Sequence, residues 1–520
     1  MTDAAILDRT DLVGSLQRLL GSGGVITEPG ECAFYAQDVF ALGPAPLCVI
    51  RPDSAEQLAR ALALVTASGI AVVPRGGGMS YTQGYVAPAA GMVVVDTGRM
   101  NRILAIDETD MTATVEAGCT WEQLHRALKP KGLRARVWGT LSGIKASIGG
   151  GMSQNGIFWG ARDGTVVDGA LSFEVALADG RLVWTGSRFF RPYGPDLTGL
   201  FAADTGALGI KTKVVLQLVR DGPAFAYCSY GFDDADAFLA AMSDAAREGL
   251  ASECFGFDPF LQAQRMKRDS LASDAKSLAN MVRAQGSVWK GIREGAKVVA
   301  AGRSFLADVP FSMHCICEGR SEAAAAADKA ALDCIVAEAG GREIENSIPK
   351  ILRANPFPPV NSMVGPEGER WVPVHGFLPH SRLNEAWRQI QALIEAEGRE
   401  IERLQVGIGA MFAVVSRSAC LIEPVFFWPD ALEELHRRSV EPAHLARLKT
   451  HARDDEARAL VTRLRAAMIE IFAELGATHL QVGRTYPLQR SHDPDAWALL
   501  EAVKREVDPN NLMNPGSLGL

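Results

Sequence analysis

Three consecutive glycines, Gly76, Gly77 and Gly78, are the residues of this sequence best suited to hold an anion. They follow an apolar run at residues 70–73, which predicts a buried strand that stops just before the glycines. Because glycine has no side chain, consecutive backbone N–H groups can converge on a pyrophosphate, and Ser80 can add a hydroxyl donor. The stretch has neither the Gly-Lys-Ser/Thr of a Walker loop nor the spaced glycines of a Rossmann turn. It therefore predicts either a phosphate-binding loop or a plain tight turn.

A second glycine-rich segment occupies residues 142–156, about seventy residues after the first. It contains Ser147 followed by the run Gly149, Gly150 and Gly151, and a third segment at residues 206–210 leads into an apolar strand. Two glycine-rich loops in one α/β unit favour a long, extended ligand that the backbone touches at two places.

Five side chains are candidates for acid–base or substrate-binding chemistry. Arg484 suits a planar anion, because its guanidinium fork donates two parallel hydrogen bonds, although a structural ion pair would also explain it. His375 and His380, five residues apart, suit a base or a metal ligand, or are ordinary structural histidines. Tyr486 and Tyr81 could supply a phenolic hydroxyl or serve in packing. The absence of G-x-S-x-G, H-E-x-x-H and C-x-x-C motifs argues against a hydrolase or a zinc enzyme.

The composition is that of an ordinary globular protein. Its 520 residues predict two to four domains, or two large ones, and a net charge of -8 without a basic tract argues against nucleic-acid binding. No apolar run approaches the roughly 18 residues of a membrane helix, and we expect no secretory signal. The nine cysteines are scattered, which favours free thiols in a reducing cytoplasm over a metal site, and we predict no metal.

Short strands and helices predict an α+β fold without regular β-α-β alternation. Strands are expected in the first half at residues 92–96, 112–117 and 171–178, and further along at 225–232 and 310–317. Helices are expected at residues 55–65, 321–339, 386–397, 432–451 and 455–475. Residues 263–304 are polar and mixed in charge, which suggests additional helices or a lid.

The motifs occur in an order that resembles the vanillyl-alcohol oxidase / p-cresol methylhydroxylase family of FAD-dependent oxidoreductases. They are Pro-Arg-Gly-Gly-Gly-x-Ser (74–80), Val-Val-Val-Asp (93–96) with Arg-Met-Asn-Arg-Ile (99–103), Ser-Ile-Gly-Gly (147–150), Gly-Pro-Asp-Leu (194–197) with Gly-Ala-Leu-Gly-Ile (206–210), and Met-Asn-Pro-Gly (513–516). The resemblance implies a two-part FAD-binding domain of residues 1–218 and 455–520. It also implies an inserted cap, or substrate, domain of antiparallel sheet and helices at residues 219–454.

The resemblance also assigns the glycine-rich segments to FAD. The residues expected to contact the cofactor are Pro74, Arg75, Gly76, Gly77, Gly78, Met79, Ser80, Thr140, Ser142, Ser147, Ile148, Gly149, Gly150, Asn155, Gly206, Gly209, Ile210 and Asn514. Family members that tether FAD through the first loop have histidine where this chain has Met79. Others tether it through a cap residue, and the matching region, residues 411–420, has no histidine or tyrosine. We therefore predict non-covalent FAD.

The sequence is compatible with two substrate classes. Phenol-oxidising family members hold the phenolate with a Tyr-Arg-Thr triplet. Arg484 and Thr485 match its second and third residues, but Gly483 replaces the tyrosine. Hydroxy-acid dehydrogenases of the family often bind a divalent metal between spaced histidines and a later Glu-His pair. That spacing is not found here, and Glu423 is the acid we would add if a metal were bound.

These features predict an oxidase or dehydrogenase that removes a hydride from the benzylic or carbinol carbon of a small phenolic or aromatic alcohol, in aromatic catabolism. Arg484 is expected to anchor the substrate, with a cap histidine or a tyrosine as base. A D-2-hydroxy-acid dehydrogenase of the D-lactate or glycolate type is the first alternative, and a catalytically idle flavin-binding module is the second. The expected partners are the substrate, O2 or an electron carrier, and a second copy in a cytoplasmic homodimer.

Overall fold

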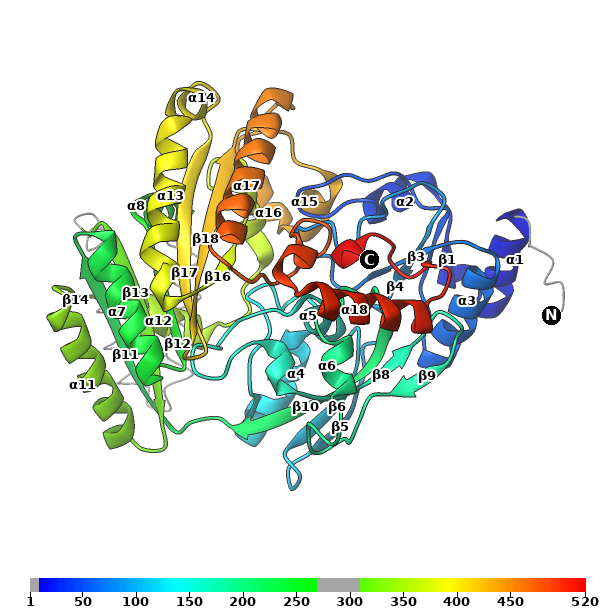
Figure 1. Ribbon diagram of the computed structural model, residues 1–520, viewed down its shortest axis with the longest axis horizontal. Helices are drawn as coiled ribbons and strands as arrows, with labels where there is room; N and C mark the ends of the chain where they lie inside the picture. Colours follow the sequence, from blue (N-terminus) through cyan, green and yellow to red (C-terminus); the bar gives the residue numbers. More distant parts are fainter. Residues whose placement is uncertain (1–8, 269–308) are drawn as a thin grey trace. The chain divides into compact units, whose positions relative to one another are not determined.

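The computed structural model describes residues 9–268 and 309–520 (Figure 1). Its internal contacts divide the chain into two compact units. The first unit comprises Met1–Phe158, Thr165–Asp221 and His479–Leu520, and the second comprises Trp159–Gly164 and Gly222–Thr478. Of the stretch predicted as additional helices or a lid, residues 269–304 lie outside the described residues. No helix in the described ranges is long and apolar enough to cross a bilayer.

A small sheet in the first unit carries the first glycine loop. Its strand order is β1 (Val25–Ile26), β2 (Cys48–Ile50), β4 (Val93–Asp96), β3 (Val72–Arg75), with β2, β4 and β3 parallel. Helices α1 (Arg9–Leu20) and α3 (Ala55–Ala67) pack their leucines against the sheet. The Ser54 side chain caps α3 by accepting a hydrogen bond from the Gln57 N–H, which fixes the start of this helix.

The larger sheet of the first unit is antiparallel and organised around its longest strand, β10 (Ile210–Arg220). Its strand order is β5 (Ile103–Asp107), β6 (Thr112–Glu116), β10, β8 (Ala170–Ala176), β9 (Leu182–Trp184), and β7 (Leu133–Ala135) also pairs with β10. Further elements of this unit are α2 (Pro29–Tyr35), α4 (Trp121–Leu128), α5 (Ile148–Gln154), α6 (Leu197–Phe201) and α18 (Pro494–Val507).

Residues near the C-terminus pair with strand β3 of the N-terminal part. The Val72 N–H donates to the Leu512 carbonyl at 2.8 Å, and the Asn514 N–H donates to the Val72 carbonyl at 2.8 Å. Met513 is fully buried in the same core as β3. The predicted α+β fold, with C-terminal residues completing the N-terminal part, is therefore confirmed.

The second unit is one antiparallel sheet with helices (Figure 1). Its strand order is β14 (Arg342–Ile344), β11 (Ala224–Phe232), β13 (Phe311–Gly319), β12 (Glu253–Phe257), β17 (Gly407–Val415), β18 (Ala419–Trp428), β15 (Arg370–Pro373), and β16 (Gly376–Pro379) also pairs with β18. The helices are α7 (Ala235–Glu248), α8 (Pro259–Arg268), α11 (Glu322–Glu338), α12 (Ser347–Ala354), α13 (Leu383–Ala396), α14 (Gly398–Arg403), α15 (Glu434–Ser439), α16 (Pro442–Leu445) and α17 (Asp455–Glu474).

Two features of this unit differ from the sequence expectations. Residues 432–451 do not form one long helix, because Pro442 starts the new short helix α16 and cannot continue α15. Helix α17, predicted to belong with the FAD-binding part, groups with the second unit, where Phe472 packs against the backbone of Gly376. The unit boundaries fall after Asp221 and Thr478 rather than after residues 218 and 454.

Candidate functional site

The first glycine loop presents a run of unused hydrogen-bond donors. Strand β3 ends at Arg75, and the N–H groups of the next five residues, 76–80, donate to no protein acceptor within the described ranges. Gly76, Gly77 and Met79 are only half-buried, so a ligand can reach this backbone. Gly78 has φ +69°, a conformation that favours glycine and turns the chain sharply. Consecutive free N–H groups in such a turn form an anion-binding concavity.

The second glycine segment lies directly against the first. A Cβ added to Gly77 would collide with the Lys145 carbonyl, and one added to Gly76 would collide with Ser147 Oγ. Ser147 Oγ also accepts a hydrogen bond from the Gly150 N–H at 3.2 Å, which starts α5. The two loops that the sequence assigns to one ligand are therefore neighbours, and only glycine permits their close approach.

Three buried polar atoms at the end of α5 and just before the third glycine segment have no protein partner in the described chain. They are Gln154 Oε1, Asn155 Oδ1 and Thr205 Oγ1. Gln154 and Thr205 flank Gly84, where a Cβ would meet both side chains. Because a buried polar atom without a hydrogen bond costs free energy, these atoms indicate a polar ligand. Asn155 was predicted, whereas Gln154 and Thr205 were missed, although Gln154 lies in the polar run that follows the glycines.

The remaining residues predicted for the cofactor frame these loops. Pro74 packs where a Cβ on Gly206 would be, Gly149 lies against Ala117, and Thr140 Oγ1 is 2.7 Å from Ser142 Oγ. Ile148 and Ile210 are buried, and Gly209 lies against Val175.

The Arg75 side chain has a structural role in the first unit. Its guanidinium carbon lies 4.8 Å from the ring centre of Phe34, 4.9 Å from that of Tyr35 and 5.2 Å from that of Tyr85. Its Nη1 donates to the Phe34 carbonyl at 3.2 Å. These cation–π contacts and this hydrogen bond fix the end of β3, so Arg75 positions the loop with its side chain.

The predicted substrate anchor, Arg484, has a different role. Its Nη1 donates to the carbonyls of Gln83 at 2.6 Å and Val86 at 3.0 Å. Its Nη2 donates to Asn514 Oδ1 at 2.7 Å and to the Pro515 carbonyl at 2.8 Å, and its Nε donates to Pro515 at 3.3 Å. All five N–H donors of a guanidinium are thereby used. The predicted anchoring of a substrate anion does not fit this geometry, because no donor is left for the substrate.

Asn514, predicted to contact FAD, completes the same arrangement. Its Nδ2 donates to the carbonyls of Gly84 at 2.8 Å and Thr205 at 2.7 Å, while its Oδ1 accepts from Arg484. We call Arg484 and Asn514 the tie pair. It joins residues 83–86, which follow the first glycine loop, to Thr205, which precedes the third glycine segment, and to the C-terminal residues. Burial lowers the pKa of the Arg484 guanidinium to about 10, so it remains protonated at neutral pH.

The two predicted tyrosines are buried in the first unit. Tyr486 is stacked on His479, with ring centroids 4.1 Å apart and an interplanar angle of 11°. The Tyr81 hydroxyl accepts a hydrogen bond from Gln481 Nε2 at 3.3 Å. Both rings thus have partners that hold them in place, and the backbone around Tyr81 belongs to the first glycine loop.

The two predicted histidines belong to the second unit, where one of them lies near a glutamate. His375 is buried, and its Nδ1 lies 4.0 Å from Glu423 Oε2 on β18. His380 instead donates through Nε2 to the Arg417 carbonyl at 2.9 Å, beside the loop between β17 and β18. Within the described residues, no group of three or more histidine, cysteine, aspartate or glutamate side chains could hold a metal.

Two buried carboxylates of the second unit titrate unusually. Burial raises the pKa of Glu253 to about 7, although its carboxylate accepts hydrogen bonds from the backbone N–H groups of Trp159, Gly160 and Cys254. Burial also raises the pKa of Asp258 to about 6, although its Oδ1 accepts from the Leu261 N–H at 2.8 Å. Glu253 thereby holds the segment Trp159–Gly164 in this unit.

We expect the free energy of unfolding to fall as pH rises from 5 to 8. A carboxyl with a raised pKa binds its proton more tightly in the folded chain, so its contribution is lost as the pH passes its folded pKa. For Glu253 alone the loss is about 3 kcal/mol. Denaturant unfolding at several pH values measures it. Glu253→Gln cannot titrate, so its stability relative to the wild type should rise with pH. A constant difference between the two proteins would contradict this assignment.

The site fits FAD. The free N–H groups of residues 76–80 match a pyrophosphate, and the second glycine segment makes the cradle narrow enough that a Cβ would close it. The unpartnered oxygens of Gln154, Asn155 and Thr205 match the polar edges of a nucleotide or flavin ring.

Comparison with curated proteins finds oxidoreductases. The chain is 33% identical over 202 residues to glycolate oxidase subunit GlcD of Bacillus subtilis, covering 38% of this chain and 42% of that one. It is 29% identical over 260 residues to D-2-hydroxyglutarate dehydrogenase of Xanthomonas citri, covering 49% and 53%. It is 28% identical over 209 residues to the mitochondrial D-lactate dehydrogenase [cytochrome] 1 of Saccharomyces cerevisiae, covering 39% and 35%. The chain spans about half or less of the length of these relatives.

Solved structures share the fold over almost the whole chain. The 4-ethylphenol oxidase of Gulosibacter chungangensis has a TM-score of 0.71 at 18% identity, covering 100% of this chain and 98% of that one. A p-cresol methylhydroxylase has a TM-score of 0.70 at 18% identity, covering 98% and 96%. The fold expected from the order of the glycine motifs is therefore confirmed.

Two family models match the chain in succession. The model described as FAD binding domain matches residues 46–186, which include the first two glycine segments. The model described as FAD linked oxidases, C-terminal domain, matches residues 224–518, more than half of the chain. The chain belongs to the FAD-linked oxidase family.

Proposed function

We propose that this FAD-linked oxidoreductase oxidises a small 2-hydroxy acid at its carbinol carbon, with His375 as the proton acceptor. The named relatives act, by their names, on glycolate, D-2-hydroxyglutarate and D-lactate, which are all 2-hydroxy acids. The residue that favoured a phenolic substrate, Arg484, has all its donors engaged by protein oxygens. The aromatic-alcohol prediction thereby loses its main support.

The observation that carries the proposal is the buried pair of His375 and Glu423. Oxidising an alcohol requires a group that takes the hydroxyl proton. When bound, FAD would supply the acceptor for the hydride of the substrate carbon. His375 suits the proton transfer, because its imidazole is buried and lies 4.0 Å from the Glu423 carboxylate, which can orient the ring and stabilise its charged form.

Replacing His375 by glutamine should slow flavin reduction by about 10²- to 10⁴-fold, the usual contribution of a general base. FAD content should stay unchanged, because the free N–H groups of the cofactor cradle lie in the other unit. Stopped-flow absorbance at the flavin band measures the rate under anaerobic conditions. His380→Gln is the matched control, since that ring donates to a backbone carbonyl, and it should change the rate less than threefold. Equal rates for the two variants would exclude His375 as the base.

A substrate panel tests the substrate class. The holoenzyme is mixed anaerobically with glycolate, both enantiomers of lactate and of 2-hydroxyglutarate, 4-ethylphenol and vanillyl alcohol. We expect a D-2-hydroxy acid or glycolate to bleach the flavin. Bleaching by the aromatic compounds alone would refute the 2-hydroxy-acid proposal. A panel in which no compound bleaches the flavin would also refute it.

An aromatic alcohol is the second candidate substrate. One observation favours it: Thr485, part of the Arg-Thr pair shared with phenol-oxidising members, has a buried Oγ1 without a protein partner in the described residues. A free hydroxyl at that place can meet a phenolic oxygen.

The cofactor is proposed to be dissociable, since Met79 cannot form the histidyl link. Acid precipitation should therefore leave the flavin in the supernatant. We further propose O2 or an electron carrier as the electron acceptor, and the rate of flavin reoxidation with each would distinguish them.

A homodimer in the cytoplasm is proposed from the family resemblance, and the nine free cysteines support a reducing compartment. Light scattering tests the dimer.

A further inference from the structure

The loop between β9 and α6 exposes aromatic side chains to an unusual degree. Phe189 is 74% exposed, Phe190 57% and Tyr193 84%, and Leu197 at the start of α6 is 49% exposed. We call these four residues the aromatic tip. Since a full aromatic side chain offers 150–250 Å², the three rings together expose on the order of 400 Å². An exposed apolar area of that size, carried by one short loop, points to a binding surface.

Arg191 braces the loop that carries the aromatic tip. Arg191, in the middle of the loop, donates through Nε and Nη2 to the Asp196 carboxylate, the latter at 2.9 Å. Its Nη1 donates to the carbonyls of Val167 at 2.8 Å and Ala170 at 3.1 Å. The loop backbone is therefore braced, which lowers the loop-ordering part of the entropy cost when the rings are buried against another surface.

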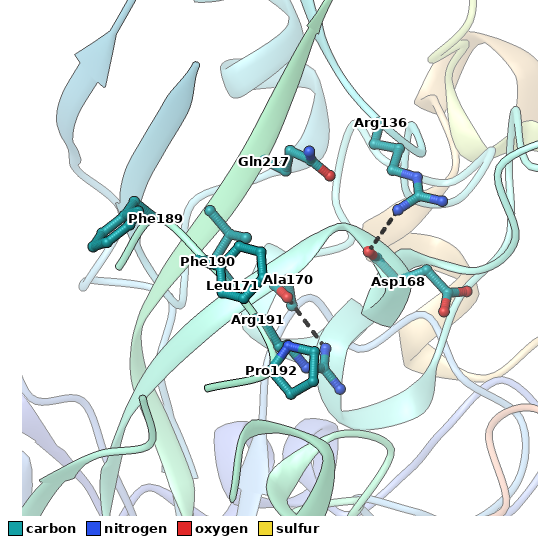
Figure 2. A pocket seen from close by; sticks show the side chains of 9 residues that line it. All are labelled: Arg136, Asp168, Ala170, Leu171, Phe189, Phe190, Arg191, Pro192 and Gln217. Atoms are coloured by element: carbon teal, nitrogen blue, oxygen red, sulfur yellow. Dashed lines mark hydrogen bonds between the residues drawn. The ribbon is translucent and has the colours of Figure 1, made fainter. Parts of the chain in front are cut away.

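Cationic groups accompany the aromatic rings. Arg188 adjoins Phe189, and its guanidinium stacks over Trp184 at 4.1 Å. A groove of about 350 Å³ beside the loop is lined by Phe189, Phe190 and Leu171, and also by Arg136 (Figure 2). In Figure 2 the Phe189 ring points away from Arg136 and Asp168. The surface thus combines an apolar tip with guanidinium groups and the Asp168 carboxylate of the groove, on a chain whose net charge is -8.

We propose that the aromatic tip inserts into the surface of a bilayer that contains anionic lipids. Aromatic side chains suit the boundary between headgroups and acyl chains, and nearby arginines attract anionic headgroups. The apolar area is only about half of the roughly 800 Å² that each partner of a stable protein complex buries, so it is too small to hold a second copy by itself. It is sufficient for reversible attachment, because binding to the interface scales with buried apolar area and needs no complementary partner shape.

Vesicle co-sedimentation of the holoenzyme tests this proposal. The vesicles contain phosphatidylcholine alone, or phosphatidylcholine with one third phosphatidylglycerol. The wild type should bind the anionic vesicles, more weakly at high salt, and the phosphatidylcholine vesicles at least fivefold less. The triple variant Phe189→Ser, Phe190→Ser, Tyr193→Ser should lose at least tenfold in the bound fraction. Arg188→Glu keeps the rings and should lose binding to the anionic vesicles only.

Leu499→Ser is the matched control, because Leu499 is 67% exposed on α18 of the same unit. It should bind as the wild type does. All the substituted side chains are exposed, so we expect each variant to fold. Flavin absorbance and the unfolding midpoint check this. The proposal is overturned if the wild type binds neither vesicle, or if the triple variant binds as well as the wild type. A dimer that the triple substitution dissociates, without vesicle binding, would assign the tip to an interface between copies.

Discussion

Replacing Arg484 by alanine should destabilise the first unit by about 3–5 kcal/mol, because several oxygens lose a charged hydrogen-bond donor at about 1–3 kcal/mol each. The substitution removes the Arg484 donor from Asn514 Oδ1 and from the carbonyls of Val86 and Pro515, and it leaves the Gln83 carbonyl with only the Val86 N–H. Because the tie pair joins residues that flank the first glycine loop and the third glycine segment, FAD affinity should fall as well. Denaturant unfolding and FAD titration measure the two effects.

The tie pair has two informative controls. Arg505→Ala removes an arginine of α18 that is 67% exposed and should cost less than about 0.5 kcal/mol. Asn514→Ala should resemble Arg484→Ala, and the double variant should cost much less than the sum of the two, because the residues share a hydrogen bond. If Arg484→Ala were stable and bound FAD normally but raised the KM for substrate, Arg484 would be a substrate anchor after all.

The second large effect is expected from Gly77→Ala. The new Cβ would collide with the Lys145 carbonyl, which is backbone and cannot move aside as a flexible side chain would. The two glycine loops must then separate, which disrupts the cradle of free N–H groups. We expect FAD affinity to fall at least 100-fold, equivalent to about 3 kcal/mol. Equilibrium titration of the apoprotein, followed by flavin fluorescence, measures the change.

Gly14→Ala is the matched control for Gly77→Ala. Gly14 lies in α1 of the same unit, and its Cβ would meet nothing closer than Arg18 Nη1 at 3.6 Å. Alanine favours a helix over glycine, so this variant should be as stable as the wild type or slightly more stable. Unchanged FAD affinity in Gly77→Ala would mean that the cofactor does not use this loop.

The parts of the site that the sequence predicts are those set by local chain geometry. A glycine run after a buried strand is visible in a few residues, and the order of three such segments indicates one ligand. The contacts of Arg484 could not be predicted, because its acceptors Gln83 and Val86 lie 401 and 398 residues away. The motif shows that an arginine is present, but only the fold shows that protein oxygens surround it.

The boundaries of the units were missed for a similar reason. Helix α17 has the amphipathic pattern expected of any packed helix, and its sequence does not reveal which sheet its apolar face covers. The packing of Phe472 against Gly376 decides that question. Likewise, Gln154 and Thr205 look like ordinary surface polar residues, and only their burial without partners marks them as ligand contacts.

We propose that the free N–H groups of residues 76–80 bind the pyrophosphate of FAD. The most direct test is to titrate the apoprotein with FAD and with riboflavin, which has the same ring system but no phosphate. The structure predicts that riboflavin binds at least 100-fold more weakly than FAD, and that ADP competes with FAD. Equal affinities for FAD and riboflavin, with no competition by ADP, would contradict the claim.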